Sequence, residues 1–379
     1  MKIILSDYHR ELLDDVKSFA ETEIKPYAAE ADKQQFLPRE LLSKMSEKKY
    51  LGATFPRELG GLELDPIIYG LLTEEIGKYC CNVRNVLTVH VSIAGQCLLE
   101  WGTKEQIEKW IPLMAEGKKI GAFSITEPEV GSDAKNINTA FKKDGAHYII
   151  NGRKKWCTLG EIADLFLVAS RCEDKMAVFI VEKATDGVEV KPLKGLLGSR
   201  ASHLAEIEFN NVIIPEENIL GDIESGLNNV VATALDHARY SVAWGSVAVA
   251  QASLEAMISY SRKRSQFGEK IRSFQLIQEF IANAVTNIYA ARSLCLRAGE
   301  LRKKGDDNAV IETTLAKYFA SKIAMKVATD AVQAHGGNGC RDEFPVERLF
   351  REAKILEIIE GTSQILLQVI SNMALIHKI

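Results

Sequence analysis

Residues 230–264 read VVATALDHARYSVAWGSVAVAQASLEAMISYSRKR, a mostly apolar run with helical periodicity. A helix on the surface of a globular protein shows an apolar stripe opposite a polar face, and this run is too apolar for that arrangement. Such a helix has to be covered on most sides by other elements. We therefore expect one long helix that packs inside a bundle, with further helices following it to the C-terminus.

Upstream of this helix the pattern changes to that of strands. Four short segments are rich in aromatic and β-branched residues and are separated by turn sequences such as KKDGA and KATDG. We therefore expect a β domain over residues 121–225. The segments are GAFSIT (121–126), HYIING (147–152), ADLFLVAS (163–170) and MAVFIVEK (176–183).

The first third of the chain has helical periodicity again. Ser6 is a plausible N-cap, apolar residues recur at helical spacing from Leu12 to Ala20, and Pro26 is expected to end that helix. The helical pattern continues to about residue 118, with a break at FPRELGGLELD (55–65). The predicted fold is mainly α with a central β domain, divided into domains 1–120, 121–225 and 226–379.

Composition narrows the class of protein. The 379 residues include 46% hydrophobic and 26% charged side chains, which is typical of a soluble protein with a substantial core. The net charge of −4 gives no reason to expect nucleic acid, and no run approaches the ~18 apolar residues of a membrane-spanning helix. The N-terminal MKIILSDYHR is predicted to be neither a signal nor a transit peptide. Seven cysteines without a CxxC pair or metal-ligand spacing predict free thiols in a reducing cytoplasm and no metal.

Five short motifs stand out, and each has an ordinary structural explanation when it is taken alone. The polar turn in TEPEVGSDA (126–134) exposes backbone N–H groups and a hydroxyl to an anion or to the edge of a heterocycle. Trp156 suits either core packing or a wall against a flat cofactor, and Arg264 has the forked donors that bind pyrophosphate. The glycines of QAHGGNGC (333–340) let a nucleotide approach the backbone closely. The motifs are TEPEVGSDA (126–134), NGRKKWCT (151–158), RKRSQFGEKIRSFQLIQ (262–278), QAHGGNGC (333–340) and EIIEGTSQ (357–364).

Glu360, in the last motif, is a carboxylate in apolar surroundings. It follows two isoleucines and precedes a Gly-Thr-Ser turn and an apolar helical stripe that begins at Ile365. A buried carboxylate without a partner costs several kcal/mol, or its pKa moves until it is neutral. Glu360 is therefore either a surface carboxylate at a helix end or a functional acid with a perturbed pKa.

Together, the order and spacing of the motifs resemble the acyl-CoA dehydrogenase flavoprotein family over essentially the whole chain. The resemblance implies a helical N-terminal domain, a middle domain of β-sandwich or barrel type and a C-terminal four-helix bundle, assembled as a homotetramer with FAD between the domains. The family patterns are TEP-x-x-GSDA, NG-x-K-x-W-x-T, R-x-x-FG followed by Gln, HGG-x-G with P-x-ER, and EGT. They occur at Thr126–Ala134, Asn151–Thr158, Arg264–Gln275, His335–Arg348 and Glu360–Thr362.

The resemblance also implies roles for single residues. Those expected to line the flavin or face its ring are Phe123, Ile125, Thr126, Ser132, Trp156 and Thr158. Those expected to hold the ADP half across a subunit boundary are Arg264, Phe267, Gln275, Gln333, Gly336 and Gly337, and Thr362 and Gln364 would also bind the cofactor. Those expected to bind substrate are Arg239, Ser132 and Gly361.

Glu360 matches the catalytic base of the family, which removes the α-proton of an acyl thioester while hydride leaves the β-carbon for the flavin. A carboxylate is a weak base in water, so the site has to raise its basicity by desolvation and to stabilise the enolate oxygen with oriented donors. Some relatives carry the base on the long helix, just before Arg239. That position is Ala238 here, so the resemblance favours Glu360.

One segment departs from the usual family pattern. GSRASHLAEIEF (198–209) has His203 and Leu204 where a polar pair is common, and it resembles the branch that acts on carrier-protein thioesters, such as the prolyl-carrier-protein oxidases. An acyl carrier protein presents an acidic helix, which basic residues at the mouth of the site would attract. The residues expected to dock the carrier are Arg153, Lys155, Lys194 and Arg200; a scattered basic surface is the ordinary explanation.

The leading prediction is therefore an FAD-dependent enzyme that oxidises an aminoacyl thioester, prolyl above all, on a carrier protein in natural-product biosynthesis. The alternative is a short-chain acyl-CoA dehydrogenase. A flavin monooxygenase and a non-catalytic carrier-binding scaffold are further alternatives, and the presence of Glu360 beside complete flavin motifs argues against both. The electron acceptor and the number of two-electron oxidations stay open.

Overall fold

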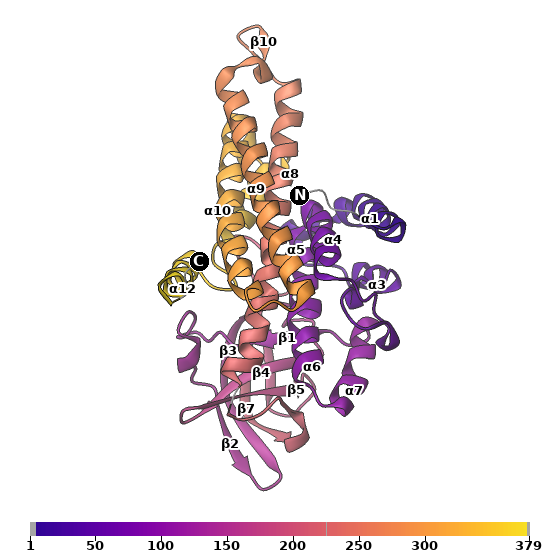
Figure 1. The fold of residues 1–379 in the computed structure, drawn as a ribbon, viewed down its shortest axis with the longest axis vertical. Coiled ribbons are helices and arrows are strands. Elements are labelled where there is room, and N and C mark those ends of the chain that lie inside the picture. Colours follow the sequence, from indigo (N-terminus) through magenta and orange to yellow (C-terminus); the bar gives the residue numbers. More distant parts are fainter. Residues whose placement is uncertain (1–4, 225, 377–379) are drawn as a thin grey trace.

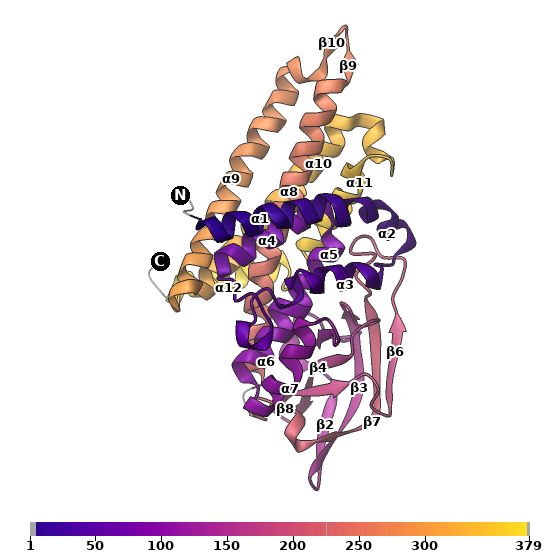
Figure 2. The same cartoon turned by 90° about the vertical axis from the view of Figure 1, so that its right-hand side faces the viewer.

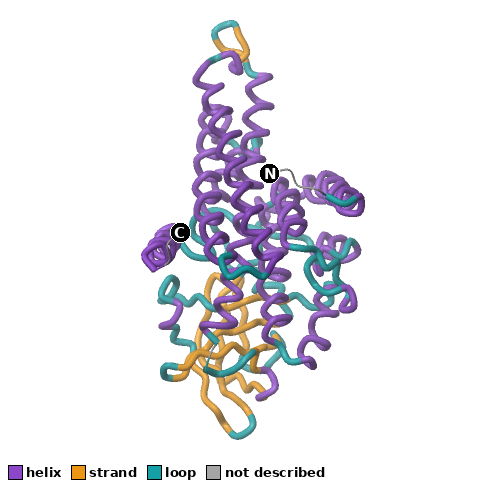
Figure 3. Tube along the Cα trace, in the orientation of Figure 1, coloured by secondary structure: helices purple, strands orange, loops and turns teal. Residues whose placement is uncertain are grey.

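The computed structural model describes residues 5–224 and 226–376. Residues 1–4, the start of the N-terminal stretch considered above, lie outside the described part, as do residues 225 and 377–379. Helices form both ends of the described chain and strands form its middle (Figure 3), so the prediction of a mainly α protein with a central β region is confirmed.

The N-terminal helices lie against one flank of the molecule (Figure 2). Ser6 caps the first of them, because its hydroxyl accepts the N–H of His9 at 3.2 Å, as predicted. The elements are α1 (Asp7–Phe19), α2 (Ala28–Gln34), α3 (Arg39–Glu47), α4 (Pro66–Tyr79), α5 (Cys81–Val86), the π-helical η5 (Leu87–Gly95), α6 (Gln96–Trp101) and α7 (Lys104–Ala115).

The predicted helix end at Pro26 is wrong. After α1 the chain stays helical through a π-helical segment, Ala20–Ile24, and a 3-10 turn, Lys25–Tyr27, that leads directly into α2. Pro26 stands in the first turn of that 3-10 segment, where its missing N–H leaves no hydrogen bond unmade. The proline therefore marks a change of helix type rather than an end.

The middle of the chain forms an eight-stranded sheet with the order β6-β7-β3-β2-β4-β5-β8, and β1 pairs parallel with β4. The β1–β4 register sets Phe123 opposite Leu167, which places the end of β1 at the edge nearest the helices. The strands are β1 (Gly121–Ser124), β2 (Ala140–Asp144), β3 (His147–Cys157), β4 (Leu165–Cys172), β5 (Lys175–Glu182), β6 (Val188–Pro192), β7 (Ala205–Pro215) and β8 (Ile219–Leu220).

The long apolar stretch is the central helix α8, as predicted. Every residue from Tyr240 to Ala250 is buried, because α8 packs against α9, α10, α11, α4 and η5. The two-stranded hairpin after it lies at the far tip of the bundle, away from the sheet (Figure 1). The C-terminal elements are α8 (Ala232–Lys263), β9 (Ser265–Gln266), β10 (Glu269–Lys270), α9 (Gln275–Lys304), α10 (Ala309–His335), α11 (Pro345–Leu356) and α12 (Ser363–Ile376).

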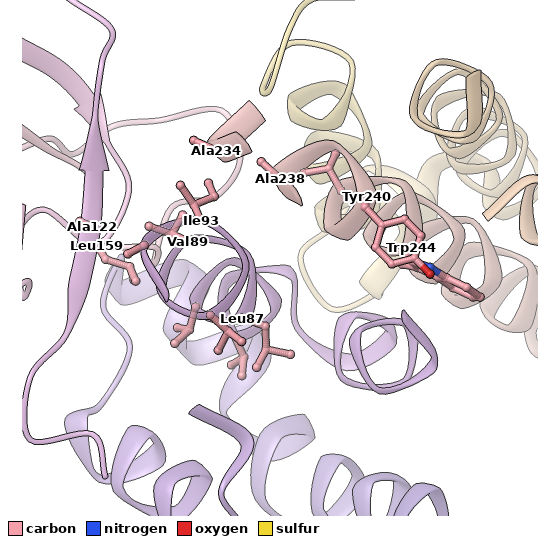
Figure 4. Packing of buried hydrophobic residues seen from close by; sticks show 14 of the residues in the cluster. Leu87, Val89, Ile93, Ala122, Leu159, Ala234, Ala238, Tyr240 and Trp244 are labelled. Carbon is pink, nitrogen blue, oxygen red and sulfur yellow. The ribbon is translucent and has the colours of Figure 1, made fainter. Parts of the chain in front are cut away.

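The helical and β regions share one core where η5 passes between them. Val89 and Ile93 of η5 lie between Ala122 of β1 on one side and Ala234 and Ala238 of α8 on the other (Figure 4). A glycine on α4 lets that helix lie close to α8, because a Cβ at Gly70 would clash with the indole of Trp244. The core therefore holds β1, η5 and α8 in a fixed relation.

Over residues 5–224 and 226–376, no helix is both long and apolar enough to cross a membrane. In the same ranges no group of His, Cys, Asp and Glu side chains has the arrangement of a metal site. The seven cysteines are free thiols, and Cys340 is the exposed one among them.

Candidate active site

Glu360 lies in the tight turn that joins α11 to α12, and its backbone has a left-handed φ of 57°. Two cations fix this turn. Arg239 of α8 donates Nε–H to the Glu360 carbonyl at 3.1 Å, and Lys317 of α10 donates to the Gly361 carbonyl at 2.7 Å. Gly361 continues the turn with φ +98°, a conformation that favours glycine. The sequence Glu-Gly therefore presents one carboxylate from a backbone held by two other helices.

The surroundings of Glu360 make its carboxylate more basic than usual. Burial raises the pKa of Glu360, and the positive charges of Lys317, Arg239 and Arg84 oppose that rise without cancelling it. Lys317 is itself fully buried, and burial lowers its pKa to about 8. A desolvated carboxylate with a raised pKa has the properties of a general base.

The TEPEVGSDA turn is fixed by a buried ion pair. The carboxylate of Glu127 accepts from Lys154 Nζ at 2.8 Å and from the backbone N–H groups of Asn138 and Thr139. Lys154 Nζ also donates to the Ile125 carbonyl at 3.0 Å. The turn after β1 is thus tied to β3, which brings Phe123, Ile125 and Thr126 beside the end of β3, while Ser132 lies exposed on the turn itself.

Trp156 and Thr158 stand at that end of β3. Trp156 has a left-handed φ of 61° and leaves 49% of its surface exposed. The neighbouring Cys157 is buried and its sulfur lies 3.1 Å from Ser124 Oγ, so β1 and β3 meet at the residue next to Trp156. A half-exposed flat aromatic ring at the end of a strand suits contact with a planar cofactor.

Arg264, Phe267 and Gln275 lie elsewhere, at the tip of the bundle. All three are exposed, and Phe267 has 95% of its surface in contact with solvent. In Figure 1 the tip and the sheet are at opposite ends of the molecule, so within one chain these residues do not join the Trp156 group. Their predicted role in a neighbouring subunit's cofactor site stays a prediction.

The Gln333–Gly337 loop ends α10. Gln333, Gly336 and Gly337 are exposed, and a Cβ on either glycine would meet no atom within 4 Å. Beneath the loop His335 stacks on Tyr260 at 4.1 Å, and Asn338 donates to the Tyr260 hydroxyl, so the open backbone is supported from below. An open, glycine-rich backbone that is supported by packed side chains can bind a nucleotide closely.

Thr362 lies just before α12, and Gln364 lies in the first turn of that helix. The Thr362 hydroxyl accepts the N–H of Ile365 at 3.3 Å, while Gln364 is exposed. Of the predicted substrate residues, Arg239 and Gly361 meet at the Glu360 turn, whereas Ser132 lies on the TEPEVGSDA turn.

Segment 198–209, which departs from the usual family pattern, is mostly buried between the β region and the helices and is not exposed at the mouth of the site. Asn82 of α5 accepts from the Ala201 N–H at 3.1 Å and from the Ser202 hydroxyl at 2.8 Å, and Asn85 donates to Ser202 at 2.7 Å. His203 is 1% exposed and bonds to Glu161 and to the Leu37 backbone. We call residues 199–203 the interdomain latch.

The four residues predicted to dock a carrier have mixed surroundings. Arg153 and Lys155 lie 3.6 and 3.8 Å from Glu206, and Lys194 lies 3.1 Å from Glu161. Arg200 is half-buried within the latch. Because acidic side chains of the same chain already face three of these cations, the attraction left for a carrier is smaller than the sequence indicates. Carrier docking stays a prediction.

Sequence reasoning missed the buried charges near Glu360 and those that fix the TEPEVGSDA turn. Lys317 and Arg84 are both 0% exposed, and Glu127 and Lys154 form a buried pair. Arg84 has a signal in the sequence, because it is the one charge in the long apolar run from Val83 to Leu99. Lys317 does not stand out, because its helix also carries Glu312, Lys322, Lys326 and Asp330. A charge inside an otherwise buried segment needs a partner or a task.

Comparison with known proteins assigns the family. The models of the acyl-CoA dehydrogenase N-terminal, middle and C-terminal domains match residues 6–118, 122–212 and 224–375. The chain belongs to the acyl-CoA dehydrogenase family, whose members are FAD-dependent oxidoreductases of acyl thioesters, so the predictions of an enzyme and of FAD are confirmed.

Individual relatives are similar over nearly their whole length. A short-chain specific acyl-CoA dehydrogenase of Clostridium acetobutylicum is 36% identical over 94% of this chain and 95% of its own. The butyryl-CoA dehydrogenase structure from Megasphaera elsdenii has a TM-score of 0.95 at 33% identity, with both chains fully covered. The prolyl acyl carrier protein oxidase AnaB has a TM-score of 0.93 at 26% identity, covering 98% of this chain and 100% of its own.

Proposed function

We propose that the protein catalyses the FAD-dependent α,β-dehydrogenation of an acyl-CoA thioester, with Glu360 as the base that takes the α-proton. The observation that carries this proposal is the Glu360 turn, in which Arg239 and Lys317 hold the backbone carbonyls beside a carboxylate of raised pKa. Similarity to the short-chain dehydrogenase and the butyryl-CoA dehydrogenase supports CoA, rather than a carrier protein, as the thioester.

The residues present fit the cofactor. The half-exposed indole of Trp156, the open glycines of the 333–337 loop and the exposed Phe267 are surfaces that this chain leaves uncovered. Phe123, Ile125, Thr126, Ser132, Trp156 and Thr158 would hold the flavin end, and the tip and loop residues of a second copy would hold the ADP end. FAD, when bound, accepts the hydride that leaves the β-carbon.

The chain's own residues do the remaining work. Glu360 receives the α-proton on its carboxylate, and its apolar setting keeps water from competing for that position. Arg239 and Lys317 fix the two carbonyls of the turn, so the Glu360 carboxylate and its backbone N–H keep one direction relative to the thioester. A fixed backbone N–H is suited to the enolate oxygen.

A second candidate is the oxidation of a prolyl group on a carrier protein, which the similarity to the prolyl acyl carrier protein oxidase supports. Two observations weigh against it. The predicted docking cations already face Glu206 and Glu161. A prolyl amine also carries a positive charge at neutral pH, and the groups around Glu360 are three further cations.

The test compares the two thioesters directly. Flavin reduction is followed in stopped flow with acyl-CoA esters of four to six carbons and with a prolyl-loaded carrier protein, each at low and at physiological salt. We expect at least one acyl-CoA to reduce the flavin about 10-fold more efficiently than the carrier, a difference of about 1.4 kcal/mol. Faster reduction by the carrier, with a rate that falls as salt rises, would replace the proposal with the second candidate.

A further inference from the structure

The loop that follows Thr158 is held by the interdomain latch. The N–H of Leu159 donates to the Ser202 carbonyl at 3.0 Å. Two residues later, the N–H of Glu161 donates to the His203 carbonyl, also at 3.0 Å. Leu159 and His203 both have left-handed backbones, with φ of 63° and 51°. Residues other than glycine keep this conformation only where neighbouring contacts impose it, and such residues gather at functional sites.

The side chain of His203 adds a third contact to the same loop. His203 is 1% exposed, and its Nδ1 lies 2.9 Å from Glu161 Oε2. Burial by itself would raise the pKa of Glu161, but hydrogen bonds from His203 and Lys194 hold that pKa below its usual value, so the carboxylate is ionised. An ionised carboxylate accepts hydrogen bonds and donates none, and Nδ1 of His203 therefore carries a proton.

The other ring nitrogen of His203 faces two backbone groups of one residue in the α2–α3 connection. Nε2 lies 3.0 Å from the Leu37 carbonyl oxygen and 3.3 Å from the Leu37 nitrogen. A neutral imidazole with its proton on Nδ1 accepts the Leu37 N–H at Nε2, whereas an imidazolium donates Nε2–H to the Leu37 carbonyl. The ring therefore keeps a partner in both charge states, and a change of charge exchanges one backbone contact for the other.

The charged groups around this imidazole act mainly through Glu161. Lys194 Nζ lies 3.1 Å from Glu161 Oε2, and Lys183 donates to the Glu161 carbonyl at 2.8 Å. From α11, Glu352 accepts the N–H of Ser199 at 3.0 Å, at the other end of the latch. The α2–α3 connection meets the imidazole with the uncharged ring of Phe36, edge to face with 5.1 Å between the ring centres. The charge in direct contact with the imidazole is therefore the Glu161 carboxylate.

We propose that His203 is a positioning residue for the end of β3, and that bound FAD senses its charge state. This inference rests on the part of the proposed function that sets Trp156 and Thr158 against the flavin. One peptide bond joins Thr158 to Leu159, so a change in the contacts of the loop reaches Thr158. Protonation of His203 also turns a negatively charged imidazole–carboxylate pair into a neutral one, which changes the electric field at the end of the strand. Position 203 is one at which the chain departs from the usual family pattern.

The first experiment is a pH titration of the visible absorption spectrum of FAD in the assembled protein, without substrate, between roughly pH 5 and pH 8. The Glu360→Gln background removes the titration of the proposed base. We expect a spectral transition that fits the uptake of one proton. His203→Asn should abolish this transition, because an amide does not take up a proton in that range. The variant should still fold and hold FAD, since asparagine tolerates a left-handed backbone and its amide can donate to Glu161.

A second variant tests the sign of the coupling. Glu161→Gln keeps a hydrogen-bond acceptor but removes the negative charge that favours the imidazolium, so the transition should persist and move to lower pH by about one unit or more. His237→Asn is the matched control, because His237 Nε2 lies 2.7 Å from Glu100 Oε1 in an imidazole–carboxylate pair between α8 and α6. We expect this control to leave the transition in place.

Three results would overturn the inference. A spectrum without a one-proton transition in the Glu360→Gln protein would do so even if His203→Asn failed to fold. A transition that His203→Asn retains, or that Glu161→Gln moves to higher pH, would reduce His203 to a structural residue. Trp156→Phe separates these failures from a failure of the proposed function: an unchanged FAD spectrum in that variant would show that the flavin lies elsewhere, whereas a changed spectrum leaves His203 alone in question.

Discussion

At the scale of single residues, Glu360 shows how an ordinary side chain becomes reactive. The Glu-Gly turn sets the carboxylate in an apolar place, and cations from α8 and α10 bind the neighbouring carbonyls rather than the carboxylate itself. Burial therefore raises the pKa while the cations keep ionisation within reach. If a cation paired directly with the Glu360 carboxylate, the pKa of Glu360 would fall, and the side chain would serve to stabilise the fold rather than to accept a proton.

Replacing Glu360 by glutamine tests its role as the base. Glu360→Gln keeps the shape and the hydrogen-bonding capacity of the side chain but cannot accept a proton. We expect the variant to remain yellow and assembled, with the rate of flavin reduction lowered by about 10²–10⁴-fold. Anaerobic single-turnover kinetics measure this rate, and near wild-type reduction would assign the base elsewhere.

The pH dependence of the same rate tests the electrostatics. The base works when ionised, so the rate should rise with pH through the raised pKa of Glu360. Lys317 lowers that pKa, and replacing Lys317 by methionine removes the lowering charge, so the profile should move to higher pH. Lys322→Met, on the same helix and paired with Glu357, is the control and should leave the profile in place. A Lys317→Met profile at lower pH would contradict this account.

At the scale of elements, the latch gives a structural reason for the unusual sequence of residues 198–209. Asn82 and Asn85 reach across from α5 to Ala201 and Ser202, and Glu352 of α11 caps Ser199. Three regions of the chain thus meet through buried polar contacts, which are specific because a misplaced partner leaves a polar group unsatisfied. The latch thus joins the β region to α5 and to α11, the helix that precedes the Glu360 turn.

Asn82→Ala should weaken this junction. The Ala201 N–H would lose its acceptor inside the protein, at a cost of about 1–3 kcal/mol in the free energy of unfolding. Asn151→Ala removes an amide of the same kind from an exposed pair with Asn211 and should change stability by less than about 0.5 kcal/mol. Thermal unfolding of both variants measures the contrast, and equal melting temperatures would show that the latch adds no stability.

The sequence predicted the helices and strands, but not the contacts between residues that lie far apart in the chain. Periodicity predicted the buried α8 and the strands because burial on all sides and alternation are local properties of the chain. The base Glu360 could be found through its motif. Asn82 and Ser202 are separated by about 120 positions, and Arg84 shows only that a charge is buried, not what it faces. The burial of segment 198–209 could not be predicted for the same reason: its sequence does not reveal that α5 covers it.

At the scale of the whole molecule, two sets of predicted cofactor residues lie at opposite ends of one chain. Trp156 and Thr158 lie at the sheet, and Arg264 and Phe267 lie at the tip of the bundle (Figure 1). A single cofactor can touch both sets only if two copies pack with the tip of one against the sheet of the other. We therefore predict that the active species is an oligomer, a tetramer by resemblance.

Arg264→Ala tests this arrangement. The loss of a charge-assisted contact to pyrophosphate should weaken FAD binding by about 10–100-fold in the oligomer. Arg262→Ala, two positions earlier on the same exposed helix end, is the control and should keep its FAD. FAD content after extended dialysis, together with the mass from light scattering, measures both effects. A fully active, FAD-loaded monomer would be incompatible with the prediction.

The rate at which the exposed Cys340 thiol reacts can report on the assembly of the protein. Burial raises the pKa of Cys80, Cys81, Cys97, Cys157 and Cys295, which makes them slow to alkylate, whereas Cys340 ends the open glycine loop and meets solvent. If a second copy's cofactor covers that loop, maleimide should label Cys340 slowly in the assembled holoenzyme and quickly once dilution or FAD loss frees it. The native chain thus carries its own reporter of assembly, without an engineered label.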